Sequence, residues 1–172
     1  VVLVIDSLSS RGAETLCFTP QRNVNFARGA KDVLQAAAHL RKLAYVDGKR
    51  IAMAGFSWGA MVGIFQSSAS LAEGLGSGAR PAATVAFYPG CGTIRPANGF
   101  PYELVYPDID LPLLVLMGGR DNETPASECL ARLEPLQKSR PGIELHLYPD
   151  ATHCWDCGHL DGQRKTDSRG NS

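Results

Sequence analysis

Residues 51–60 read IAMAGFSWGA, and the interpretation of the whole chain starts from this stretch. The apolar run Ile51–Ala54 leads directly into the segment GFSWG, in which Ser57 lies between two glycines. One interpretation is a glycine-rich turn whose serine caps the next helix. The other is a nucleophilic serine on a sharp strand-to-helix turn, which small residues on both sides allow to close. The elements around this stretch decide between the two.

Apolar runs alternate with amphipathic segments along the chain. Unbroken apolar and β-branched runs predict strands at Val1–Ile5, Ile51–Ala54, Ala82–Tyr88, Leu111–Met117 and Ile143–Leu147. Helical spacing and capping residues predict helices along Val33–Ala44, from Trp58 to about Ala69, and from Thr124-Pro125 to Pro135. This alternation predicts an α/β fold, with a mainly parallel sheet and helices on both faces. Active sites in such sheets lie at the carboxyl ends of the strands.

Length and composition limit the classes of protein to consider. With 172 residues, 44 % of them hydrophobic, the chain suits one domain with a sizeable core. We expect an α/β core over residues 1–157 and a polar tail or loop over residues 158–172. The chain begins on an apolar run without a leader, as a piece of a longer protein would.

Charge and hydropathy point away from two kinds of partner. Lys plus Arg and Asp plus Glu both total 17, and no basic stripe or acidic tail is present in the sequence. No apolar run approaches the roughly 18 residues of a spanning helix. We therefore expect neither a nucleic-acid nor a membrane partner, while the sequence does not indicate an oligomeric state.

Three residues that follow predicted strands could form a catalytic triad. A serine hydroxyl is a weak nucleophile that needs a neighbouring base, itself held by an acid. Among four histidines, His153 in YPDATHCWD is the one that follows a strand end, so we predict it as the base; packing against Trp155 is the alternative. Asp121 in MGGRDNETP is the predicted acid, although Glu123 could replace it or Asp121 could cap the next helix. Ser57, Asp121 and His153 come in the order serine, acid, histidine along the chain, which is the order of the α/β-hydrolases.

Five blocks of the sequence resemble consecutive blocks of the dienelactone hydrolase family, in its serine-bearing branch. Within residues 2–156 they read VIDSLSSRGAETLC, YVDGKRIAMAGFSWGA, VAFYPGCG, LLVLMGGRDNETPASEC and LYPDATHCWD. The resemblance implies an α/β-hydrolase fold, here incomplete at both ends, with Ser57, Asp121 and His153 as nucleophile, acid and base. It also implies a Cys91–Cys129 disulfide and, with it, a periplasmic or secreted protein. Reduced, buried thiols are the alternative.

The predicted chemistry is hydrolysis of a small-molecule ester or lactone through an acyl-enzyme, which requires no metal and no organic cofactor. The backbone N–H of Trp58 is the predicted first donor to the oxyanion, and no segment of the sequence supplies the usual second donor. A peptidase or other acyl hydrolase of the same fold is one alternative. A catalytically incompetent fragment is the other.

Further residues have two open interpretations each. Arg11 in DSLSSRG could bind a substrate carboxylate or anchor its loop to a nearby acid. Phe56 and Trp58 could line an acyl pocket or be core and rim aromatics, and for Phe56 the core is favoured. Cys154 and Cys157 have C-x-x-C spacing without a second pair, so we predict neither a zinc site nor a redox motif. The segment Gly90–Asp110, rich in proline and glycine, could cover the site.

Overall fold

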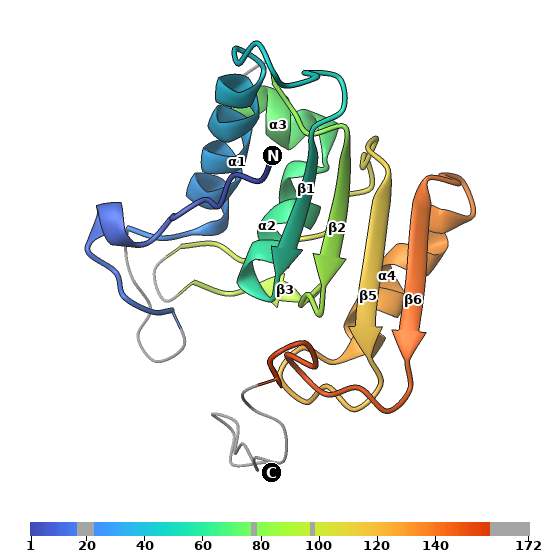
Figure 1. Cartoon of the computed structure of the whole chain (residues 1–172). Coiled ribbons are helices and arrows are strands. Elements are labelled where there is room, and N and C mark those ends of the chain that lie inside the picture. The colour runs from blue at the N-terminus through green and yellow to red at the C-terminus, as the bar shows by residue number, and fades with distance from the viewer. Residues whose placement is uncertain (17–22, 77–78, 97–98, 159–172) are drawn as a thin grey trace.

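A sheet of four parallel strands forms the centre of the computed structural model, which describes residues 1–16, 23–76, 79–96 and 99–158 (Figure 1). In spatial order the strands are β1 (Ala52–Phe56), β2 (Ala83–Phe87), β5 (Leu113–Gly118) and β6 (Ile143–Tyr148). All four point to the same end of the sheet. The predicted mainly parallel α/β architecture is confirmed, and each of these strands was predicted to within two residues at both ends.

Helices and two short strands occupy the connections. The elements are a short 3-10 turn, η1 (Ser9–Arg11), the helices α1 (Phe26–Leu40), α2 (Trp58–Gln66), α3 (Ala69–Gly74) and α4 (Ala126–Gln137), and an antiparallel pair, β3 (Thr93–Ile94) with β4 (Tyr102–Glu103). α3 is a separate helix, begun by the Ser68 side chain, which accepts a hydrogen bond from the Leu71 N–H. None of the described helices is both long enough and apolar enough to cross a membrane.

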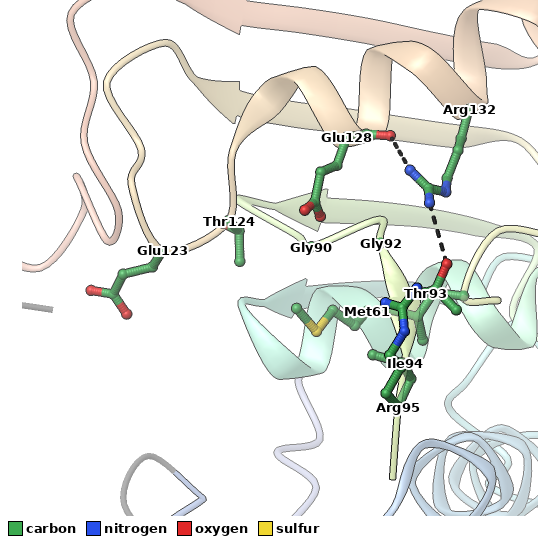
Figure 2. Close-up of a pocket in the computed structure, with 11 residues that line it drawn as sticks. Met61, Gly90, Gly92, Thr93, Ile94, Arg95, Glu123, Thr124, Glu128 and Arg132 are labelled. Atoms are coloured by element: carbon green, nitrogen blue, oxygen red, sulfur yellow. Dashed lines mark hydrogen bonds between the residues drawn. The ribbon is translucent and has the colours of Figure 1, made fainter. Parts of the chain in front are cut away.

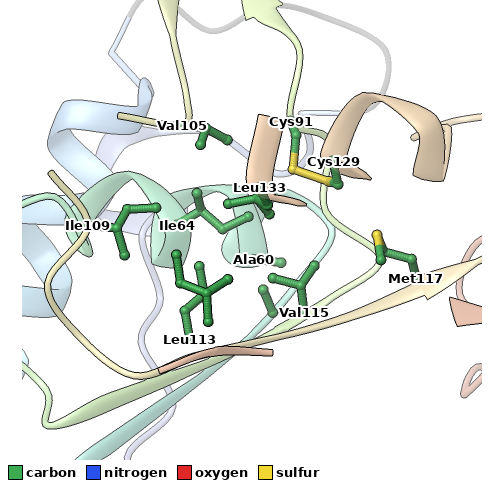
Figure 3. Packing of buried hydrophobic residues seen from close by; sticks show 12 residues of the cluster. Ala60, Ile64, Cys91, Val105, Ile109, Leu113, Val115, Met117, Cys129 and Leu133 are labelled. Atoms are coloured by element: carbon green, nitrogen blue, oxygen red, sulfur yellow. A yellow bond between two sulfur atoms is a disulfide. The ribbon is translucent and has the colours of Figure 1, made fainter. Parts of the chain in front are cut away.

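The helices α2 and α4 pack against the same face of the sheet. Figure 3 shows the shared cluster, which takes Ala60 and Ile64 from α2, Leu113, Val115 and Met117 from β5, and Cys129 and Leu133 from α4. The three β5 residues lie on one face because successive side chains of a strand alternate in direction. All seven are at most 1 % exposed, so this cluster fixes both helices over the sheet.

The opposite face of the sheet, for which helices were also expected, is open to solvent along β1. Ala52 and Ala54 are exposed, and Phe56 on the same face is 48 % exposed. Phe56 is therefore not a core residue, contrary to the favoured interpretation of the sequence. Its ring stacks on Phe87 of the neighbouring strand, with the ring centroids 4.7 Å apart.

α1 packs on α2. Its buried residues include Val33 and Ala37, as the apolar spacing predicted, whereas Ala44 lies beyond the end of the helix and is exposed. Gly29 allows the close approach, because a Cβ at this position would come within 2.6 Å of the Trp58 ring. A larger residue at Gly29 would push the first turn of α2 away from α1.

Two expectations about regular structure were wrong. Val1–Ile5 forms no strand: Val1, Val2 and Val4 are at least 85 % exposed, and the segment pairs with no described strand. β-branched composition favours a strand only where a neighbour accepts its backbone hydrogen bonds. Pro135 lies inside α4, which ends two residues later at Gln137, so the proline marks the last turn and does not end the helix itself.

A disulfide joins Cys91, in the loop after β2, to Cys129 in α4. Both residues are fully buried and belong to the cluster between the sheet and the helices. The predicted pairing is confirmed. Since the two cysteines are 38 positions apart in the sequence, the bond closes a loop that contains β3, β4 and β5.

Removal of this disulfide should lower the free energy of unfolding. The double substitution C91A/C129A removes a cross-link between positions 38 apart in the sequence. The unfolded chain regains the entropy that the closed loop had removed, which predicts that the free energy of unfolding decreases by about 4 kcal/mol. Urea unfolding followed by circular dichroism would measure it. The matched control C154A/C157A removes a bridge between cysteines only three positions apart and should lose less. Equal losses in the two variants would contradict the loop-length argument.

Candidate active site

Ser57 lies on a strained turn between β1 and α2. Its φ of 48° and ψ of −112° fall outside the regions that residues with a Cβ normally adopt. The backbone holds this conformation from both sides: the Ser57 N–H donates to the Phe87 carbonyl, and the Ser57 carbonyl accepts from the Met61 N–H, each at 3.0 Å. Such strain costs about 1–3 kcal/mol and is concentrated at functional sites.

The two glycines of the GFSWG segment have different importance. A Cβ on Gly55 would overlap the carbonyl group of Gly59 and the N–H of Ala60, so only glycine fits there. A Cβ on Gly59 would meet no atom within 4 Å. The expectation that the turn needs small residues on both sides therefore holds for Gly55 and is wrong for Gly59.

Three side chains meet where the strands end. His153 Nε2 is 3.0 Å from Ser57 Oγ, and His153 Nδ1 is 2.8 Å from Asp121 Oδ2. Ser57 follows β1, Asp121 follows β5 and His153 follows β6, which is the placement expected from the sequence. The His153 side chain is 11 % exposed and the Asp121 side chain 1 %. The hydrogen bonds therefore lead from a partly accessible imidazole to a fully buried carboxylate.

Several donors hold the Asp121 carboxylate. Oδ1 accepts the backbone N–H groups of Glu123 and Thr124, each at 2.9 Å. Burial raises the pKa of Asp121, but hydrogen bonds from His153 and Thr124 outweigh this effect and keep that pKa below its ordinary value of 3.8. The carboxylate is thus ionised at neutral pH and can only accept, so the proton of the imidazole belongs on Nδ1. Nε2 is then free to accept the Ser57 hydroxyl.

Thr124 belongs to the site and is not a helix cap. Pro125 occupies the capping position of α4. The Thr124 hydroxyl instead lies 2.8 Å from Asp121 Oδ2, 3.0 Å from the Tyr88 carbonyl oxygen and 3.2 Å from His153 Nδ1. Sequence reasoning assigned the capping role to Thr124 because threonine before proline is a common helix start. The structure uses that side chain to join the loops after β2, β5 and β6.

Trp58 and Glu123 flank the reacting atoms. Trp58 is the first residue of α2, and the N–H groups of a first helical turn have no acceptor within the helix. Its N–H is therefore suited to binding an oxyanion, while its ring stacks on Phe26 of α1, with centroids 5.7 Å apart. Glu123 Oε2 lies 4.0 Å from His153 Nε2, so the acidic residue considered as a substitute for Asp121 faces the other ring nitrogen.

Arg11 and Phe56 lie outside this constellation. The Arg11 guanidinium makes two hydrogen bonds of 2.7 Å to the Asp32 carboxylate and one of 2.6 Å to the Ser7 carbonyl. This geometry supports the anchoring interpretation, and a contact with substrate stays a prediction. The substrate contact suggested for Phe56 stays a prediction as well.

A cavity of about 300 Å³ opens beside the site (Figure 2). Glu123 and Thr124 line it at the catalytic side, and Met61, one helical turn after Ser57, forms part of the wall. At the far side Arg132 donates to the Glu128 carbonyl oxygen at 3.3 Å. The segment 90–95 supplies much of the remaining wall, so the part of the chain that was expected to cover the site lines a cavity next to it.

Sequence reasoning missed the second disulfide, which joins Cys154 to Cys157 directly after His153. Asp156 brings a third potential ligand atom to the same place, but the two sulfurs are bonded to each other. The C-x-x-C spacing was the available signal, and it was considered only as a zinc or redox motif.

Comparison with protein families identifies the chain. The model of the dienelactone hydrolase family matches residues 6–167. The chain belongs to the dienelactone hydrolase family. The resemblance inferred from the sequence blocks is thereby confirmed. No curated protein matches the chain.

Solved structures of α/β-hydrolases share the fold of this family member. The α/β-hydrolase enzyme MGS-M1 from a Medee basin deep-sea metagenome library is 22 % identical, with a TM-score of 0.57 over 82 % of this chain and 54 % of that one. The butyrate-bound esterase of the Planctomycetes species Thermogutta terrifontis is 19 % identical, with a TM-score of 0.56 over 77 % and 58 %. A Pyrococcus furiosus esterase is 21 % identical, with a TM-score of 0.52 over 78 % and 58 %. The chain thus spans a little over half the length of each structure.

The two glycines of the turn provide a direct test of its geometry. Gly55→Ala should lower the free energy of unfolding by about 1–3 kcal/mol, because the new methyl group overlaps the backbone at Gly59 and Ala60. Gly59→Ala should be neutral or stabilising by up to about 1 kcal/mol, because alanine favours the helix. Thermal and urea unfolding of the two variants would measure both effects. The opposite order would show that the tight contact lies elsewhere in the turn.

Proposed function

We propose that the protein is a serine hydrolase that cleaves ester or lactone bonds in small molecules. The hydrogen-bonded series Ser57, His153 and Asp121, with its nucleophile on a strained turn, is the observation that carries the proposal. Membership of the dienelactone hydrolase family and the esterases of the same fold support this class of substrate.

The reaction would begin with proton transfer from Ser57 Oγ to His153 Nε2, 3.0 Å away, as Oγ attacks the carbonyl carbon. Asp121 would hold the imidazole in the tautomer that leaves Nε2 as acceptor, and its charge would stabilise the imidazolium. The N–H of Trp58 would donate to the oxyanion. Collapse of the tetrahedral intermediate passes the proton from Nε2 to the leaving alcohol. Water, deprotonated by His153, then hydrolyses the acyl-enzyme and releases the carboxylic acid.

The cavity lined by Glu123, Thr124 and Met61 would accept one side of the substrate. Its volume of about 300 Å³ suits a small molecule, and its walls combine apolar groups with charges of both signs. The two disulfides in the described chain also support a proposal about compartment: the protein would act in an oxidising environment, periplasmic or extracellular.

Reaction with a fluorophosphonate ester would test the nucleophile. We expect one adduct, mapped by mass spectrometry to Ser57, and none in Ser57→Ala. His153→Ala should slow the labelling by about 100- to 10,000-fold, because the general base is lost. Ser127 in α4 is exposed and should remain unlabelled, which gives an internal control. A folded wild type without an adduct at Ser57 would refute the proposal.

Two conservative substitutions distinguish the acid. Asp121→Asn should reduce kcat by on the order of 10,000-fold, because an amide facing Nδ1 favours the wrong imidazole tautomer. Glu123→Gln should reduce kcat less than tenfold, since Glu123 faces the other ring nitrogen. A panel of an aryl ester, a lactone and a peptide amide would measure both variants and define the substrate class. The reverse ranking of the two variants would assign the acid to Glu123.

A further inference from the structure

Tyr88, which directly follows β2, contacts the ring of the proposed base, His153, and takes no part in the proposed reaction. It is 3 % exposed and has a φ of 42°, so the chain accepts an unfavourable backbone conformation in order to place this side chain. Its ring meets the His153 imidazole edge to face, with centroids 4.8 Å apart and an interplanar angle of 65°. The ring of Trp155 packs on Tyr88 in the same manner at 4.9 Å.

The Tyr88 hydroxyl binds the loop that carries the base. It donates a hydrogen bond of 2.8 Å to Asp156 Oδ1 and lies 3.6 Å from Cys154 Sγ. Burial, followed by the hydrogen bond and charge of Asp156, raises the pKa of Tyr88, so the phenol stays protonated and acts as donor over the neutral range. A buried group thereby anchors Asp156, which is itself exposed on the surface loop.

The loop is also closed on itself. The Cys154–Cys157 disulfide encloses Trp155 and Asp156 in a ring that begins one residue after His153. Within it, the Cys157 N–H donates to the Cys154 carbonyl at 2.9 Å. Asp156 therefore cannot move far from Tyr88 without moving the backbone that continues from His153.

We infer, on the basis of the proposed function, that Tyr88 and Asp156 are positioning residues for His153, and that the Cys154–Cys157 disulfide makes their hydrogen bond effective. Asp121 controls the tautomer of the imidazole through Nδ1, while the Tyr88 ring limits rotation of the imidazole and the Tyr88–Asp156 bond limits movement of its backbone. Catalysis is sensitive to such restraints, since a displacement of about 1 Å can cost about 100-fold in rate.

A merely structural role for Tyr88 would give a different result. If the hydroxyl only stabilised the fold, its loss would lower the free energy of unfolding and leave the kcat of the folded enzyme unchanged. A positioning role predicts a lower kcat with an unchanged KM, because substrate binding does not require the imidazole to be aligned.

The test compares kcat and KM for one aryl ester across a set of variants. Tyr88→Phe and Asp156→Ala should each lower kcat about tenfold, with KM within twofold of the wild type. The double variant should lose no more than either single variant, because both remove the same hydrogen bond. Asp156→Asn should recover most of the kcat, since its amide oxygen still accepts from the phenol. C154S/C157S should also lower kcat, as Tyr88→Phe and Asp156→Ala do.

Matched controls lie on the same loop and the preceding strand. Tyr148→Phe removes a hydroxyl from a tyrosine whose ring is 5.5 Å from Trp155, and Asp150→Asn neutralises an exposed carboxylate. Neither control side chain takes part in the Tyr88–Asp156 hydrogen bond or in the His153–Asp121 hydrogen bond. Both variants should keep the kcat of the wild type.

Three outcomes would overturn the inference. Unchanged kcat in Asp156→Ala, an exposed position that tolerates truncation, would remove the role of the bond even if Tyr88→Phe failed to fold. Additive losses in the double variant would show two separate effects. Wild-type protein that neither hydrolyses the ester nor reacts at Ser57 would overturn the proposed function and this inference with it. An active wild type whose Tyr88 and Asp156 variants keep the same kcat would overturn this inference alone.

Discussion

The parallel pairing of β1, β2, β5 and β6 is the constraint on which the site depends. The register places Phe56 beside Phe87 and Phe87 beside Leu116, so the chain leaves the first three strands at nearly the same level. Ser57 and Asp121 are far apart in sequence but follow the ends of strands in one sheet, and His153 follows the end of the fourth strand. The pleat makes this arrangement strict, because a shift of one residue in any pair would exchange the faces of that strand.

The buried side of the sheet and the triad could be predicted because they depend on simple rules. The run around Val115 reads as a strand from composition alone. The neighbouring strands β2 and β6 supply the backbone hydrogen bonds without which an apolar, β-branched run does not form a strand. Ser57, Asp121 and His153 could then be placed by their positions after strand ends. The same composition rule failed for Val1–Ile5, where no described strand lies alongside.

The supporting contacts of the site could not be predicted, since they depend on directions that a linear pattern does not contain. Thr124 precedes a proline in the manner of a helix cap, yet its hydroxyl faces Asp121 and the Tyr88 carbonyl. Tyr88 reads as the last residue of an apolar strand, yet its φ is positive and its ring lies against His153. Phe56 is apolar and follows the apolar run Ile51–Ala54, but it lies on the uncovered face of β1.

The buried bond between Cys91 and Cys129 also has a mechanical consequence. A force applied to the two ends of the chain passes through the sulfur atoms and bypasses the segment between the two cysteines, which contains β5 and Asp121. That segment corresponds to roughly 130 Å of extended chain, which cannot be drawn out while the bond is intact. A machine that threads the oxidised protein through a narrow channel would therefore meet a closed covalent loop, whereas the reduced protein would present a single strand of polypeptide along its whole length.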